Sequence, residues 1–177
     1  MPFPFPQHGR GAPGPCRPEP PECPHPPSEC KPCPPPCPCP REAFAYLTQS
    51  GTLEVCRRSG EIPFCGECLL GGGFTRDGGK VRIPAPGFYQ AAYTLHLPAA
   101  KPLNTVFCLQ ADGRNLPGSV LRVWKPPGSG SASFAAQVIW EAAAPCALRL
   151  ASSRDFRLDS PGPSDTMATL SILPLRS

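Results

Sequence analysis

The stretch Phe88-Tyr-Gln-Ala-Ala-Tyr-Thr-Leu-His-Leu97 decides the fold, because apolar side chains recur in it with a period of two. Tyr89, Ala91, Tyr93 and Leu95 occupy one set of alternating positions, and the residues between them are mostly small or polar. Since a β-strand places alternate side chains on opposite faces, the stretch predicts a strand with one face in a core. We expect these four side chains to point into that core.

Similar short runs of β-branched, aromatic and leucine residues fill the chain from Glu42 onward, and glycine and proline separate them. Turn sequences such as Asp112-Gly113 and Ser160-Pro-Gly-Pro163 lie between the runs. No stretch has the 3.6-residue spacing of an amphipathic helix. The pattern predicts an all-β antiparallel sandwich, with strands at 43–48, 53–57, 61–64, 79–83, 88–97, 105–110, 119–124, 133–140, 147–151 and 168–173.

The first forty residues differ from the rest of the chain: they contain 17 of its 29 prolines and 6 of its 11 cysteines. So few aliphatic side chains cannot offset the entropy of ordering a backbone, and repeated proline favours an extended, polyproline-like conformation. The sequence therefore predicts a disordered proline- and cysteine-rich arm at residues 1–41 and a folded head at residues 42–177. The three-residue glycine period of collagen is absent from the arm.

The six cysteines of the arm are candidates for cross-links to other chains: Cys16, Cys23, Cys30, Cys33, Cys37 and Cys39. Zinc binding is the alternative, and Cys30-Lys-Pro-Cys33 has the spacing of a metal turn. Proline directly follows four of the cysteines, however, and it has no N–H to donate to a thiolate. Cross-linking is therefore favoured, and no cofactor or metal is expected.

Cys65-Gly-Glu-Cys68 resembles a redox motif, but the glycine run at residues 71–73 cannot continue the helix that a dithiol enzyme needs. A local disulfide, a bond to Cys56, or a pair of free loop thiols remain as alternatives. Cys65 and Cys68 are further cross-linking candidates. Cys108 and Cys146 lie in strand-like runs, where cysteine usually acts as a small buried apolar residue.

The residues predict no catalytic activity. Nucleophilic catalysis usually needs a histidine held as a base beside the nucleophile. His8 and His25 lie in the arm, and His96 has no acidic residue near it in sequence. A net charge of +4, scattered along the chain, does not indicate a nucleic-acid binder. No apolar run approaches the length of about 18 residues that a membrane span needs, and the first residues lack the features of a signal peptide.

The order of motifs in the head resembles the tumour-necrosis-factor-like and complement globular-head jelly rolls. The stretch Val81-Arg-Ile-Pro-Ala-Pro-Gly-Phe-Tyr-Gln-Ala-Ala-Tyr93 resembles the entry to their long inner strand. Leu116-Pro-Gly-Ser119, Leu148-Arg-Leu150 and Ala168-Thr-Leu-Ser-Ile172 are similar to later motifs of these proteins, in the same order. The head is most similar to the C-terminal domains of bacterial collagen-like spore-surface (exosporium) proteins, although the arm lacks their long Gly-x-y stalk.

This resemblance implies a non-enzymatic structural protein of the spore surface, made in the mother-cell cytoplasm without a signal peptide. It implies that the jelly-roll head forms a homotrimer, whose other partners are further spore-surface proteins. The second face of the long strand would then lie at the subunit contact, through Gln90, Ala92 and Thr94. The arm would tether or cross-link the trimers.

Two alternatives follow from other features of the chain. The trimeric head could recognise a carbohydrate or a host receptor, for which Trp124-Lys125 and Arg154 with Arg157 are the candidate residues. The arm could instead bind metal, a role that the zinc content of the purified protein would reveal.

Overall fold

The computed structural model describes residues 42–56, 58–99 and 101–175, and these ranges form an all-β head with antiparallel pairing throughout. The arm and its six cysteines lie outside the described residues. None of the described residues belongs to a helix that could cross a membrane.

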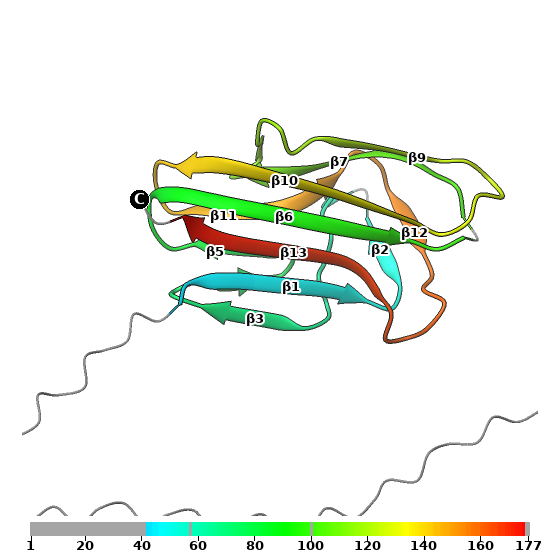
Figure 1. Ribbon diagram of the computed structural model, residues 1–177, viewed down its shortest axis with the longest axis horizontal. Coiled ribbons are helices and arrows are strands. Elements are labelled where there is room, and N and C mark those ends of the chain that lie inside the picture. Colours follow the sequence, from blue (N-terminus) through cyan, green and yellow to red (C-terminus); the bar gives the residue numbers. More distant parts are fainter. Residues whose placement is uncertain (1–41, 57, 100, 176–177) are drawn as a thin grey trace, which may run out of the picture. The chain divides into compact units, whose positions relative to one another are not determined.

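A five-stranded sheet forms one layer of the head, in the order β10-β6-β13-β1-β3, and lies at the front of Figure 1. The long strand β6 pairs with β10 along its whole length and with β13 from Phe88 to Leu95. The strands are β1 (Phe44–Ser50), β3 (Cys68–Gly71), β6 (Gly87–Leu97), β10 (Ala132–Ala142) and β13 (Thr166–Leu175).

A six-stranded sheet lies behind it in the order β4-β5-β11-β7-β8, with β9 paired to the β7 strand as well (Figure 1). Its strands are β4 (Thr75–Asp77), β5 (Lys80–Ile83), β7 (Leu103–Ala111), β8 (Arg114–Asn115), β9 (Leu121–Lys125) and β11 (Cys146–Ser152). A small ladder joins β2 (Leu53–Val55) to β12 (Phe156–Leu158). Most neighbouring strands, such as β1 and β13 or β5 and β11, are distant in sequence, as in a jelly roll. The all-β sandwich prediction is confirmed.

The core lies between the two sheets, and the alternation of β6 positions its side chains as the sequence predicts. Tyr89, Ala91, Tyr93 and Leu95 are all buried, whereas the intervening residues are partly exposed. From the other sheet, Phe107, Leu109 and Leu150 are fully buried, among other residues. The period of two on β6 therefore fixes which face of the five-stranded sheet is inside.

The Tyr93 hydroxyl forms a hydrogen bond across the sandwich, from β6 to the connection before β9. It donates a hydrogen bond of 2.9 Å to the carbonyl of Ser119, whose own hydroxyl donates to the Leu116 carbonyl at 2.7 Å. Burial raises the pKa of the Tyr93 phenol, and the nearby Cys108 thiol adds to that rise. The folded head therefore keeps this proton at pH values at which the unfolded chain releases it.

Tyr93 should make the head less stable in alkali. Its raised pKa leaves stability unaffected below about pH 9, and costs up to about 1.4 kcal/mol per pH unit above about pH 10. We expect Tyr93→Phe to lower the free energy of unfolding by about 1 kcal/mol at pH 7, because one hydrogen bond is lost. Between pH 9 and 11 the free energy of unfolding should then fall less in Tyr93→Phe than in the wild type, because the variant has no phenol at this position to ionise. Urea unfolding at each pH measures both effects, and parallel curves for the two proteins would contradict the assignment.

The segment between β2 and β5 departs from the sequence prediction. The prediction of a strand at 61–64 is wrong, because Glu61 forms only an isolated bridge, to Ala151. Pro63 has no N–H for a ladder, and Phe64 has a positive φ of 47°, which leaves the strand conformation. Strands β3 and β4, which the sequence did not predict, lie on either side of the glycine run instead.

The turn at Asp112-Gly113 is where the sequence places it, between β7 and β8. Both residues have positive φ values, 46° and 80°. Such values are required in a two-residue hairpin turn whose backbone follows the twist of the sheet. Asp112 also accepts a hydrogen bond of 2.9 Å from the Ala147 N–H, which joins the turn to β11.

The strand expected at 119–124 begins later, at Leu121, because Ser119 belongs to the preceding turn.

Candidate functional site

The open face of the five-stranded sheet carries most of the exposed large apolar side chains of the described residues. Strand register aligns them in rows: Gln90 lies between Ile139 and Leu173, and Phe88 lies between Glu141 and Leu175. The exposed fractions are 48% for Leu69, 49% for Phe88, 57% for Ile139, 46% for Leu173 and 37% for Leu175. We call this surface the apolar face.

Charge is nearly absent from the apolar face. Glu141 is the one carboxylate among the outward-facing residues of its five described strands, and no lysine or arginine faces outward there. Towards the opposite end of β6 the rows become polar, ending at His96 and Ser133. One end of the face is therefore apolar and the other can form hydrogen bonds.

The sequence-predicted contact residues Gln90, Ala92 and Thr94 lie on this face, along its β6 strand, and are partly exposed. Sequence reasoning missed the larger side chains beside them on β10, β13 and β3. Ile139 and Leu173 each flank Gln90, although the three residues come from distant parts of the chain. Only the strand pairing brings them together.

The cysteines of the head are free in the described residues, so neither a Cys65–Cys68 disulfide nor a bond to Cys56 is formed. Cys56 and Cys65 are exposed and Cys68 is half-buried at the start of β3. Cys108 is buried as expected, and Cys146 is half-buried. Burial is the main cause that raises the pKa of both of these thiols, which makes them poor nucleophiles.

The residues proposed for ligand recognition separate in the structure. Trp124 is 68% exposed, but Lys125 is only 3% exposed, so the expectation of an exposed Trp124-Lys125 pair is wrong for the lysine. The strand alternation turns Lys125 inward, where its ammonium donates to the carbonyls of Ala99 at 3.0 Å and Lys101 at 3.1 Å, and more weakly to that of Ser129 at 3.4 Å.

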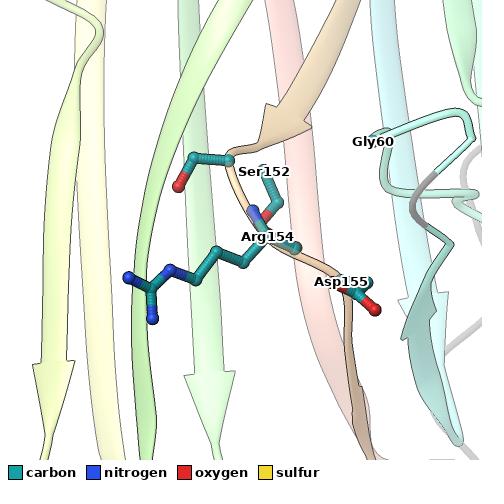
Figure 2. A pocket seen from close by; sticks show the side chains of 5 residues that line it. Gly60, Ser152, Arg154 and Asp155 are labelled. Carbon is teal, nitrogen blue, oxygen red and sulfur yellow. Dashed lines mark hydrogen bonds between the residues drawn. The ribbon is translucent and has the colours of Figure 1, made fainter.

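Arg154 and Arg157 also differ in their surroundings. Arg157 is held by Glu54 and Asp159, with N–O distances of 3.4 and 3.1 Å. The guanidinium of Arg154 has no carboxylate partner among the described residues and lies beside a pocket of about 320 Å³. Figure 2 shows its side chain extending away from Asp155 and Gly60.

No described group of side chains has the arrangement of a catalytic site. His96 Nδ1 lies 2.9 Å from Ser133 Oγ, and Asp165 lines the same pocket. The Asp165 carboxylate accepts from the Gly162 N–H at 2.8 Å and makes no ion pair with His96, so nothing orients the imidazole as a base. Within the described ranges, no three metal-binding side chains are grouped together either.

Comparison with solved structures identifies the class of fold. The head is similar to murine APRIL at pH 5.0, with a TM-score of 0.51 and 13% identity over 76% of this chain and 99% of that chain. Murine APRIL at pH 8.5 (TM-score 0.48, 13% identity) and at pH 8.0 (TM-score 0.49, 14% identity) match over the same shares of the two chains. APRIL has the tumour-necrosis-factor fold, and the head is therefore a TNF-like jelly roll. No family model and no curated protein sequence matches this chain.

Proposed function

We propose that the protein is a non-enzymatic structural component of a spore surface, whose TNF-like head forms a homotrimer through the apolar face. The observation that carries the proposal is that this face combines exposed apolar side chains with a near absence of charge. Exposed apolar patches of this kind are typical of protein interfaces. The resemblance to exosporium proteins supports the location of the assembly.

Burial of the apolar face provides the energy for association. Removing a large apolar side chain from water stabilises a complex by up to about 1.5–3 kcal/mol, and the half-exposed residues here would each contribute about half of that. Glu141 stands at the edge strand β10, so few charges must lose water when subunits meet. The polar residues Gln90 and Thr94, on the second strand of the sheet, can supply hydrogen bonds that fix the orientation of the subunits.

The arm would then join the trimers covalently. Three arms in one trimer hold many thiols at high local concentration, which favours bonds between chains. With a small disulfide such as oxidised glutathione as oxidant, two arm thiols form one protein disulfide and the reagent is reduced to two thiols. The exposed Cys56 and Cys65, with the half-buried Cys68, are accessible partners on the head, whereas Cys108 is not.

Deletion of residues 1–41 should abolish the high-mass species that reductant removes, and should leave the melting temperature of the head within about 2 °C. The head has enough chain to bury its own core, which explains the second expectation. Replacing the six arm cysteines with serine is the matched control, because it keeps the arm and removes its thiols. The test is a gel of oxidised protein with and without reductant, together with a thermal melt.

Two results would contradict the cross-linking role of the arm. Oxidised full-length protein that runs as a monomer would exclude it, and so would undiminished high-mass species in the serine variant. Zinc bound in stoichiometric amounts to protein purified without chelator would favour the metal-binding alternative instead.

A further inference from the structure

The open face of the six-stranded sheet differs from the apolar face in charge. Its outward-facing strand positions include four basic side chains and one acidic side chain, namely Lys80, Arg82, Arg122, Arg149 and Asp77. Arg149 is neutralised by Glu61 at 3.5 Å, whereas Arg82 and Arg122 have no carboxylate within ion-pair distance among the described residues. The surface that the proposed trimer leaves open is therefore basic.

Trp124 and Arg122 lie on the same side of β9, two residues apart, and face outward beside Asn104 and Val106 of β7. The indole is 68% exposed, which is unusual for so large an apolar side chain. On the far side of β7, the Ser153 N–H donates to the Val106 carbonyl at 2.8 Å, and Arg154 follows. Two strand spacings, about 10 Å, therefore separate the start of Arg154 from the strand of Trp124.

A polar pocket of about 320 Å³ adjoins Arg154 and is lined by Gly60, Ser152, Ser153, Arg154 and Asp155 (Figure 2). The Asp155 carboxylate makes no ion pair with any described residue. The Asp155 carboxylate lines this pocket, and the Arg154 guanidinium extends away from it (Figure 2). The hydroxyls of Ser152 and Ser153 are already hydrogen-bonded within the protein, to Thr105, the Arg154 carbonyl and the Val106 N–H. A free carboxylate and a free guanidinium held apart suit a ligand that carries both hydroxyl donors and separated negative charges.

We propose that this surface binds an acidic polysaccharide, one whose sugar rings carry carboxylate or sulfate groups. Trp124 would stack its indole against the C–H face of one sugar ring, because the amphipathic indole suits a ligand that is apolar on one face and hydroxylated at its rim. Arg122 and Arg154 would bind the anionic groups with their planar pairs of N–H donors. Asp155 would accept hydrogen bonds from sugar hydroxyls in the pocket.

The structure favours a polysaccharide over a nucleic acid. Proteins that hold single strands usually offer several aromatic platforms, whereas Trp124 is the single exposed aromatic side chain among the outward-facing residues of the described six-stranded sheet. The site lies on the sheet opposite the apolar face, so its test is independent of trimer formation.

Binding of the full-length protein should be measured by calorimetry with three soluble probes: a polyuronate for the carboxylate, a sulfated polysaccharide for the sulfate, and neutral dextran. We expect affinity for at least one of the charged probes and none for dextran. Trp124→Ala should weaken that affinity at least tenfold, and Arg122→Gln combined with Arg154→Gln should do the same. Arg157→Gln is the matched control, because Glu54 and Asp159 already engage this arginine, and it should change the affinity less than twofold.

Trp124 distinguishes the proposed site from simple ion exchange. If Trp124→Ala binds as tightly as the wild type, or if Arg157→Gln weakens binding as much as the double variant, the site is wrong. Binding to neither charged probe, or equal and Trp124-independent binding to single-stranded DNA, would also overturn it. A thermal melt of each variant confirms that the head is folded, as we expect for substitutions of exposed side chains.

Discussion

The Ile139→Glu, Leu173→Glu double variant should sediment as a monomer at concentrations at which the wild type sediments as a trimer. Both side chains are about half-exposed in the single head and flank Gln90 in one row of the apolar face. In the assembly each new carboxylate would be buried without a cation, since the face has no outward lysine or arginine on its described strands. An unpaired buried charge costs several kcal/mol, so we expect association to weaken at least about 100-fold.

Val120→Glu provides the matched control for this variant. Val120 is also an exposed apolar residue, 55% accessible, but it lies in the connection before β9 and outside the apolar face. This substitution should leave the sedimentation coefficient unchanged. Dissociation by Val120→Glu, or a stable trimer in the double variant, would place the subunit contact elsewhere.

Lys125→Met should lower the free energy of unfolding by about 2–3 kcal/mol, because a buried set of hydrogen bonds loses its donor. The Lys125 ammonium joins the connection between β6 and β7 to the turn after β9, through the carbonyls of Ala99, Lys101 and Ser129. Methionine keeps the apolar stem and so separates the effect of the charge from that of packing. Urea unfolding at neutral pH measures the difference.

Lys101→Met is the control for Lys125→Met. The Lys101 side chain is exposed and forms a 2.9 Å ion pair with Asp159, a type of solvent-screened contact that contributes little to stability. Equal losses in the two variants would show that the three carbonyls are satisfied by water, and that the buried ammonium has no special structural role.

The alternation of β6 was enough to predict its buried face from sequence, because one long strand with a clear period of two is a local signal. Strands β3 and β4 were missed because each is only three or four residues long and borders a glycine run. The opposite error at 61–64 arose because Ile62 and Phe64 are apolar and buried, although their segment is not a strand. Burial and strand pairing are separate properties, and composition indicates only the first.

The sequence predicted the candidate surfaces less completely than it predicted the fold. Gln90, Ala92 and Thr94 could be assigned to a second face from the period of β6, but Phe88, Ile139 and Leu173 join them only through the order of the strands. Lys125 was expected to be exposed because lysine rarely is buried. The alternation of β9 turns its side chain inward. Carbonyl acceptors from two connections hydrogen-bond the Lys125 ammonium and offset the free-energy cost of burying it.

Sedimentation equilibrium of the reduced wild-type protein at micromolar concentration tests the central claim most directly. Reductant removes any contribution from disulfides, so the mass reports only the non-covalent association of the chains. The proposed trimer predicts a mass of three chains, independent of reductant concentration. A mass of one chain under these conditions would contradict the trimeric head.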